Sequence, residues 1–398
     1  MEALFNPLSS DLNGSLSLLL KEIDKTFPVP ARFVSALPRN VAELSRLLSS
    51  ARPERKEGYL NDPALLGAYM RYFLPWNIYR LCKLFSSESI GSFIASLFLA
   101  DDENHGVIDL GSGPLTLALA LWISFPALRS KKITLFCIDH NRSALRAGEK
   151  LFYAFTGPKS AWNIKLLHVD MRHGIPDSAK THPVKLLCAV NIFNEIFWKI
   201  PQADTEKLKD FAEKQAFLLS KASDTNSALL VVEPGVPRCG QFIHFLKVAF
   251  ESRDLVIRSP CPRCSACCMR GGKRGSKWCH FYFDTDDSPK DLQKLSGAAG
   301  LSKDKAVLSF LLAQKSALPK KESDDLLDLR VISDLFPLPE YQYGRYACSA
   351  KGLVLLRGSK KIMESCPSGA ELSARKSAFG GIDKKSGALI LPVPEHGL

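Results

Sequence analysis

Acidic residues are scarce in this chain of 398 residues, which carries 41 Asp and Glu against 53 Lys and Arg. The formal net charge is +12 and the sequence pI is about 9.1. Such an excess of positive charge favours an anionic partner, either nucleic acid or an anionic membrane surface. Charge alone is equally compatible with a basic protein whose surface is simply solvated.

Long apolar runs are also absent. No stretch reaches the roughly 18 apolar residues that a membrane-spanning helix requires, so we expect no membrane partner. The first basic residue is Lys21, and Glu2 and Asp11 precede it, so the start lacks the basic, acid-poor character of a leader sequence. We therefore expect a cytoplasmic protein whose cysteines remain reduced and available to metals.

Periodicity and composition predict four segments. Residues 1–100 carry apolar residues at helical spacing and predict an N-terminal helical region. Residues 101–255 alternate short apolar strands with helices, which is typical of a doubly wound parallel sheet. Residues 256–325 contain a cysteine-rich loop and a helical insert, with 302–316 expected to be helical. Residues 326–398 have short β-like runs broken by glycines, and predict a small β-rich appendix that contains cysteine.

Acids end three consecutive predicted strands. Asp109 starts the run Asp109-Leu110-Gly111-Ser112-Gly113, whose glycines let the backbone approach a ligand near a helix N-terminus. Asp139 ends the second strand, where a carboxylate can accept both ribose hydroxyls, and Asp170 ends the third, where a carboxylate can meet an adenine amine. This arrangement resembles class I S-adenosylmethionine methyltransferases. It predicts that fold and a donor site comprising Asp109, Gly111, Ser112, Gly113, Asp139, Asp170 and Asn194.

The glycine turn has two other interpretations. A dinucleotide site is less well supported, because Gly111-x-Gly113-x-x-Thr116 lacks the third small residue of that fingerprint. A third glycine is also common in methyltransferase turns, and Leu115 stands nearby instead. A sheet whose ligand site has decayed is therefore the competing hypothesis.

Catalytic residues are weakly marked. Residues 191–195 stand where base-methylating enzymes carry Asn-Pro-Pro-aromatic, a sequence that holds a flipped base, and that sequence is absent here. Glu195 is the catalytic candidate, and with Glu233 it is expected to flank the mouth of the site. A capping role for Glu195 is equally well supported. Donor binding is thus better supported than methyl transfer, and the protein is either a methyltransferase or an inactive relative.

Cysteine is concentrated in one segment, since five of the eleven cysteines lie between residues 261 and 279. Thiolates at this density favour zinc or an iron–sulfur cluster. One ligand set has ferredoxin-like spacing, Cys261, Cys264 and Cys267, but it lacks the next cysteine and its proline. The other set comprises Cys261, Cys267, Cys279 and either Cys348 or Cys366. His280, beside a ligand cysteine, is expected to act from outside the ligand set.

The same segment is strongly basic. It contains no acid, and its basic residues are Arg263, Arg270, Lys273, Arg274 and Lys277. A cationic loop next to an inorganic centre predicts a surface that contacts RNA phosphates.

Five short motifs carry a resemblance to a known family: Asp109-Leu110-Gly111-Ser112-Gly113-Pro114, Asn194-Glu195, Glu233-Pro234-Gly235, Pro260-Cys261-Pro262 and Trp278-Cys279-His280-Phe281. In order and approximate spacing, over about residues 60–370, the chain resembles the methyltransferase-like family of the mitochondrial small ribosomal subunit and its bacterial relatives. The resemblance implies S-adenosylmethionine as cofactor, a [4Fe–4S] cluster, and small-subunit ribosomal RNA or the small ribosomal subunit as partner. Carried onto this sequence, the cluster ligands are Cys261, Cys267, Cys279 and Cys348, with Cys264, Cys268 and Cys366 as alternates.

The sequence therefore predicts an iron–sulfur, S-adenosylmethionine-dependent methyltransferase-like protein that binds small-subunit ribosomal RNA. It would act as an rRNA methyltransferase or as a ribosome assembly factor. One alternative is a zinc-stabilised methyltransferase acting on a small molecule or a protein. Another is a non-enzymatic, RNA-binding assembly protein with a vestigial donor site.

Overall fold

The computed structural model describes residues 2–56, 58–99, 104–225, 227–261, 267–268, 278–315 and 325–395. By their contacts the residues divide into two units. Unit 1 comprises residues 1–6, 191–283 and 307–398, and unit 2 comprises residues 7–190 and 284–306. The predicted division into four segments stays a prediction.

Unit 2 begins with the predicted helices. These are α1 (Ser10–Thr26), α2 (Ala31–Val34), α3 (Leu37–Leu48), α4 (Pro63–Ala68), α5 (Leu74–Phe85) and α6 (Glu88–Leu99), with a π-helical turn at Tyr69–Phe73. All residues of α5 except Arg80 are buried, which is the pattern of a helix packed on every side. The predicted helical N-terminal region is confirmed.

Unit 2 also contains four parallel strands in the order β3-β2-β1-β4. They are β1 (His105–Leu110), β2 (Ile133–Asp139), β3 (Trp162–His168) and β4 (Val184–Val190). Every residue of β1 and β2 is buried, as expected for central parallel strands covered on both faces. Helices α7 (Thr116–Ser124) and α8 (Arg142–Thr156) follow β1 and β2, so the predicted alternation of strand and helix is present.

Unit 1 contains β5 (Ala228–Pro234), β6 (Leu255–Ser259) and most of β7 (Phe281–Asp284) and β8 (Lys305–Lys315), with α9 (Phe193–Phe197), α10 (Thr205–Ala222) and α11 (Pro237–Glu251). Strand β8 lies antiparallel to both β5 and β6. Phe193, Phe197 and Phe211 gather around Phe242 of α11, with ring centroids 5.1 to 5.8 Å from it. This aromatic cluster holds the three helices together.

The prediction that residues 302–316 are helical is wrong, because β8 occupies Lys305–Lys315. Residues 308–313 are all buried between β5 and β6, and all of them except Ser309 are apolar. A short continuous apolar run fits a buried strand as well as a helix, and periodicity alone does not separate the two. The helix of this region is α12 (Lys290–Ala298), which belongs to unit 2.

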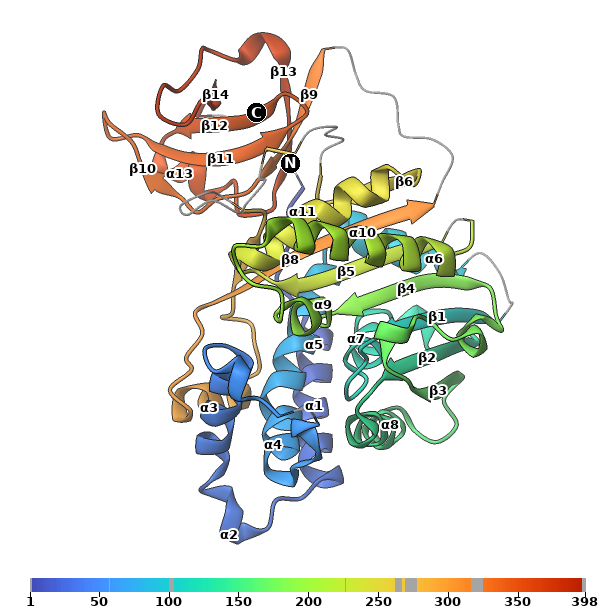
Figure 1. The fold of residues 1–398 in the computed structure, drawn as a ribbon. Helices are drawn as coiled ribbons and strands as arrows, with labels where there is room; N and C mark the ends of the chain where they lie inside the picture. Colours follow the sequence, from blue (N-terminus) through green and yellow to red (C-terminus); the bar gives the residue numbers. More distant parts are fainter. Residues whose placement is uncertain are drawn as a thin grey trace. The chain divides into compact units, whose positions relative to one another are not determined.

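The C-terminal part of unit 1 is a second sheet, drawn in orange to red in Figure 1. Its strands are β9 (Leu326–Val331), β10 (Phe336–Pro337), β11 (Tyr343–Ser349), β12 (Gly352–Gly358), β13 (Glu371–Arg375) and β14 (Leu389–Pro392), with helix α13 (Lys360–Glu364). Leu329, Val331, Val354 and Leu356 are fully buried in its core. The predicted β-rich C-terminal region is confirmed. Glu2 pairs with Glu371 of β13, an addition that the sequence did not predict.

Among the described residues, no helix combines the length and the apolar character that crossing a bilayer requires.

Candidate functional site

The turn after β1 is built from residues in the left-handed region. Gly111 and Gly113 have φ values of 69° and 50°, which glycine adopts readily. Leu115, at φ 60°, is fully buried in the same region, where a non-glycine residue costs about 1–2 kcal/mol. The backbone N–H groups of Gly111 and Ser112 donate to the Ile138 carbonyl oxygen at 2.8 and 3.1 Å. The turn is therefore held against the end of β2.

Asp139 closes this turn. Its Oδ2 accepts from the backbone N–H of Gly113 at 2.9 Å and its Oδ1 from that of Asn141 at 2.7 Å. The structure thus brings the second predicted acid to the predicted glycine turn. Both carboxylate oxygens already bond the backbone, and each keeps a further lone pair for a ligand hydroxyl.

Asp109 lies beneath the turn with 1% of its surface exposed. Its Oδ2 is buried and has no hydrogen-bond partner among the described residues. The pKa of Asp109 is raised to about 8, mainly by burial and to a smaller extent by the charge of Asp139, while a hydrogen bond with Ser112 opposes the rise. An unsatisfied buried oxygen costs about 1–3 kcal/mol, so it marks a place where a ligand group can complete the bonding. S-adenosylmethionine fits, because its ammonium and sulfonium groups are positively charged and favour the ionised carboxylate.

The sequence predicts that Asp170 ends the third strand, but Asp170 lies two residues beyond that end. Strand β3 ends at His168, and Asp170 instead caps a 3₁₀ turn, where its carboxylate accepts from the backbone N–H and the Nε of Arg172 at 2.9 and 2.8 Å. An adenine contact at Asp170 stays a prediction.

In unit 1, Asn194 is bound to Glu233 of β5. Glu233 is fully buried and accepts from the backbone N–H of Phe193 at 2.8 Å and from the Asn194 side-chain amide at 2.8 Å. Burial raises the pKa of Glu233 to about 8, although these hydrogen bonds oppose the rise. The roles of Asn194 in donor binding and of Glu195 in catalysis stay predictions. The link between the Asn194-Glu195 and Glu233-Pro234-Gly235 motifs was missed, although both motifs stood in the sequence.

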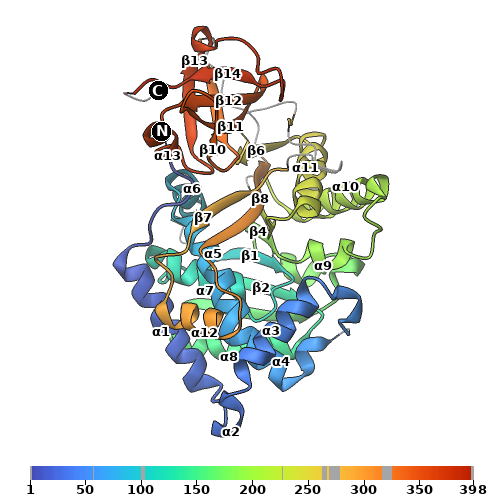
Figure 2. The same cartoon turned by 90° about the vertical axis from the view of Figure 1, so that its left-hand side faces the viewer.

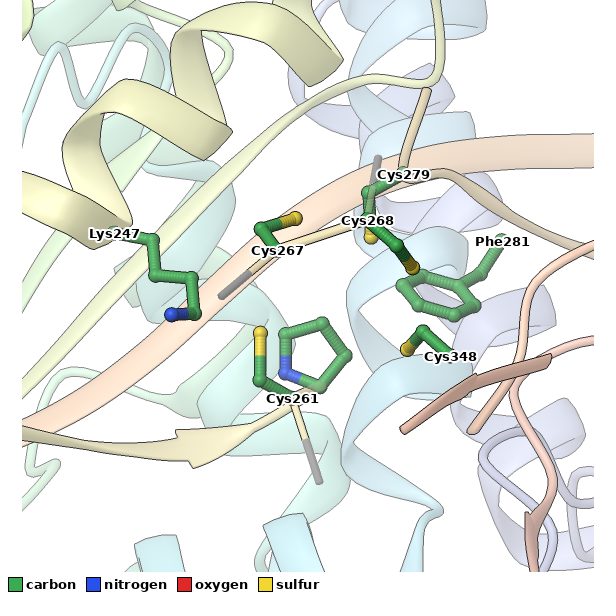
Figure 3. A pocket seen from close by; sticks show the side chains of 8 residues that line it. Lys247, Cys261, Cys267, Cys268, Cys279, Phe281 and Cys348 are labelled. Carbon is green, nitrogen blue, oxygen red and sulfur yellow. The ribbon is translucent and has the colours of Figure 1, made fainter. Parts of the chain in front are cut away.

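Five cysteines line one small cavity (Figure 3). They come from three separate segments and are Cys261, Cys267, Cys268, Cys279 and Cys348, accompanied by Lys247, Pro260 and Phe281. Their sulfur atoms point toward a common space in Figure 3. That space measures about 20 Å³, enough for about one water-sized body. As the side chains stand, no group of three or more His, Cys, Asp or Glu residues in the described ranges is arranged to hold a metal ion.

Three of the five cysteines lie on a β strand, are hydrogen-bonded to one, or lie beside a residue that is. The Pro260 carbonyl oxygen, next to Cys261, accepts from Arg330 Nε at 2.9 Å, and Arg330 lies on β9 opposite Cys348 of β11. The Cys279 carbonyl oxygen accepts from the Ser309 hydroxyl of β8 at 2.7 Å. The sheets of unit 1, rather than the loop alone, therefore bring these thiols together.

The thiols interact electrostatically. Burial raises the pKa of Cys279 well above its usual value, and the neighbouring Cys261 and Cys267 raise it further. The pKa of Cys348 is also raised well above its usual value, mainly by a hydrogen bond with Cys268 and secondly by burial. The thiol form is thus favoured in the metal-free site, and a soft metal centre would bind by displacing these protons.

Buried cations accompany the thiols. Lys247 is 2% exposed and bonds Glu251 at 2.6 Å. Burial alone would lower the pKa of Lys247, but Cys261 and Glu251 outweigh this effect and raise it. Arg330 is 4% exposed and acts to lower the pKa of Cys279. The donor set, thiols flanked by cations, suits an anionic iron–sulfur or zinc–thiolate centre.

The remaining predicted residues lie elsewhere. Cys366 is buried in the core of the C-terminal sheet with Val331 and Met363, and it does not line the cysteine cavity. His280 stacks on Trp278, with ring centroids 4.7 Å apart, and is likewise not among the lining residues. The predictions that fall outside the described residues concern Cys264, Arg263, Arg270, Lys273, Arg274 and Lys277.

Comparison with known proteins gives one family match. Residues 205–332 match the model of a family described as mitochondrial small ribosomal subunit Rsm22. This range contains the cysteine-rich segment and Glu233. No curated protein matches the chain.

Solved structures similar to this chain include methyltransferases. A protein from Listeria monocytogenes described as a class I S-adenosylmethionine-dependent methyltransferase is 13% identical, covers 79% of this chain and 91% of its own, and has a TM-score of 0.35. An S-adenosylmethionine-dependent methyltransferase from Leishmania major is 13% identical, with coverages of 74% and 91% and a TM-score of 0.32. A precorrin-6y C5,15-methyltransferase from Geobacter metallireducens is 8% identical, with coverages of 58% and 90% and a TM-score of 0.32.

The predicted mixed α/β class is confirmed, with parallel strands that alternate with helices, a helical N-terminal region and a β-rich C-terminal region. The family match fits the predicted resemblance to a methyltransferase-like family.

Proposed function

We propose that this chain is a cytoplasmic, S-adenosylmethionine-dependent methyltransferase-like protein of the small ribosomal subunit that binds its ribosomal RNA and holds a [4Fe–4S] cluster. It would serve as an rRNA methyltransferase or as an assembly factor. The observation that carries the proposal is the convergence of five thiols from three segments on one cavity. The match of residues 205–332 to the Rsm22 family supports the ribosomal part.

Cys261, Cys267, Cys279 and Cys348 would hold the cluster, with Cys268 as the alternate that lines the same cavity. The cluster would supply a covalent cross-link between the cysteine-rich segment and β11. Lys247 and Arg330 would offset its negative charge. The basic residues between 263 and 277 would then be presented to RNA phosphates.

The donor would bind in unit 2. The glycine turn would receive the methionine and ribose parts of S-adenosylmethionine, and Asp109 would supply its unsatisfied oxygen. Asp139 would hold the turn in the observed conformation by accepting hydrogen bonds from the Gly113 and Asn141 backbone N–H groups.

Anaerobic purification, with iron, acid-labile sulfide and zinc measured on one sample, tests the metal centre. We expect about four iron and four sulfide per chain. Cys348→Ser should lower both, whereas Cys366→Ser, which changes a buried cysteine outside the cavity, should leave both unchanged. Stoichiometric zinc without sulfide would refute the cluster and favour the zinc-stabilised alternative.

Calorimetry with S-adenosylmethionine tests the donor site separately. The wild-type protein should bind the donor, and Asp109→Ala should weaken binding at least about tenfold, the equivalent of one charge-assisted hydrogen bond. Absence of binding by the wild-type protein would favour a non-enzymatic assembly protein. Methyl transfer to small-subunit rRNA, followed with a labelled donor, distinguishes the enzyme from the assembly factor.

A further inference from the structure

Two cations of unit 2, Arg80 and Lys303, interact electrostatically, and neither has a carboxylate partner among the described residues. Arg80 is the one residue of α5 that is not fully buried. Its Nη1 donates to the Asn77 side chain at 2.7 Å, but its Nε is buried and reaches no acceptor in the described part of the chain. Lys303 lies between α12 and β8. It is partly exposed, so solutes can reach it.

The ammonium group of Lys303 lies over two aromatic rings. Its ammonium lies 5.3 Å from the ring centroid of Tyr72 and 5.6 Å from that of Trp76. Trp76 Nε1 donates to the Ser296 hydroxyl of α12 at 3.2 Å, and the Tyr72 hydroxyl donates to the Leu301 carbonyl oxygen at 3.3 Å. These bonds tie the α12 segment to the N-terminal helices. Figure 2 shows α12 beside α3, which it contacts.

The other buried cations of this unit have acidic partners. Lys83, one turn beyond Arg80 on α5, is paired with Asp287 at 2.9 Å, and Arg71 is paired with Asp24 at 3.0 Å. For Arg80 and Lys303 the described residues offer no such pair, and the two charges repel each other. Burial lowers the pKa of Lys303 to about 8, with Arg80 contributing, and burial also lowers the pKa of Arg80.

The interactions that are present do not balance this cost. A cation–π contact contributes about 0.5–2 kcal/mol, whereas removing an ion from water costs several kcal/mol. An anion from outside the chain would offset the repulsion and part of the desolvation cost by pairing with both cations. The pair is therefore incomplete in the chain alone.

We propose that Arg80 and Lys303 form a binding site for one phosphate group, carried by a nucleotide or by a nucleic-acid backbone. A phosphate carries enough negative charge to neutralise two cations, and its oxygens match the fork of an arginine as well as a lysine ammonium. Neither residue belongs to the donor turn or to the cysteine-rich segment. The site is thus a further one, independent of the proposed function.

The test compares Lys303→Met with Lys305→Met, because Lys305 is exposed two residues along and its replacement removes the same charge. Inorganic phosphate, AMP and a short single-stranded RNA are titrated against both variants and the wild-type protein, with affinity measured by calorimetry. We expect the affinities for inorganic phosphate and AMP to fall at least tenfold in Lys303→Met and to stay within twofold of wild type in Lys305→Met.

The Lys303→Met protein should remain folded, because the change removes a desolvated charge. Its melting temperature without phosphate should equal or exceed that of the wild-type protein. Phosphate should raise the melting temperature of the wild-type protein but not that of Lys303→Met. Arg80→Gln should reproduce the loss of affinity.

If RNA binds at least tenfold tighter than AMP only when Lys303 is present, the phosphate belongs to a polynucleotide. If AMP binds as tightly as RNA, the phosphate belongs to a nucleotide. Equal affinities in Lys303→Met and Lys305→Met would overturn the proposal.

Discussion

At the scale of single residues, Asp109 and Glu233 are carboxyl groups that the fold buries at the ends of strands β1 and β5. Burial raises the pKa of each to about 8. Glu233 has three hydrogen-bond donors around it, whereas the Oδ2 of Asp109 has none in the described residues. Glu233 therefore has a structural role in positioning α9, and Asp109 is the better candidate for contact with a ligand.

The raised pKa of Asp109 predicts a pH dependence. In the unfolded chain an aspartate titrates near 3.9, so between about pH 4 and 8 the folded state binds a proton that the unfolded state has lost. Folding stability contributed by this group must then fall as pH rises. Asp109→Asn removes the titration, so its stability relative to wild type should improve from pH 5 to pH 8, by at most about 1.4 kcal/mol per pH unit.

Urea denaturation without donor at pH 5, 6, 7 and 8 measures this difference. Asp177→Asn is the control, because the Asp177 side chain is fully exposed and should give a difference that does not change with pH. A constant difference for Asp109→Asn would show that the carboxyl is already ionised in the folded protein.

Sequence patterns located these acids well but not their bonds. The run Asp109-Leu110-Gly111-Ser112-Gly113 marks a turn, because glycine tolerates positive φ, and the structure has that turn. The contact between Asp139 and the Gly113 N–H joins residues 26 positions apart. Such a contact depends on the pairing of β1 with β2, which no local pattern states.

At the scale of elements, α11 and the Trp278-Cys279 segment pack with almost no spare room. A Cβ added at Gly240 of α11 would lie 2.8 Å from Trp278 Cδ1 and 3.1 Å from the Cys279 carbonyl oxygen. Trp278 is also held by a 3.0 Å bond from its Nε1 to the Gly235 carbonyl oxygen. A methyl group at Gly240 must therefore displace the segment that carries a proposed cluster ligand.

Gly240→Ala should destabilise the protein by about 1–3 kcal/mol, the usual cost of overpacking, and should lower iron content. Gly14→Ala in α1 is the matched control, since nothing lies within 4 Å of its added Cβ. That change should stabilise the protein by about 0.5–1 kcal/mol and leave iron unchanged. Thermal unfolding and iron analysis of both variants check the pair; a Gly240→Ala protein with full stability and iron would contradict the packing argument.

Strand and helix positions followed from periodicity in most of the chain. Asp139, which is predicted to end the second strand, is the last residue of β2, and α8 follows it as the predicted alternation of strand and helix requires. The failure at 302–316 has a definite cause. Strand β8 is central, with β5 and β6 on its two sides, so its apolar residues run without the alternation that reveals an exposed strand.

At the scale of the whole molecule, the net charge of +12 predicts a strong salt dependence of RNA binding. Each phosphate contact releases counterions, so it makes the negative slope of log affinity against log salt steeper, by about 0.7 for single strands and about 0.9 for duplexes. Replacing all five basic residues between 263 and 277 with glutamine should therefore make this slope shallower by about 3–5.

Filter binding of a small-subunit rRNA fragment between 50 and 200 mM salt, concentrations over which such contacts change affinity by orders of magnitude, measures the slope. The control replaces five exposed lysines of α10 and neighbouring surface, Lys199, Lys207, Lys209, Lys214 and Lys221. An equal reduction in both variants would mean that total charge, rather than the cysteine-rich segment, governs binding.

The sequence by itself determined the alternation of strands and helices before residue 256, the glycine turn with its acids, and the density of thiols, because each is a local pattern of residue types. Only the tertiary structure decided that Cys348 reaches the cysteine cavity while Cys366 lies in a separate core, and that Arg80 and Lys303 meet without an acid. The physical reason is that strand register and helix packing place residues far apart in the chain, and neither is encoded at any single position.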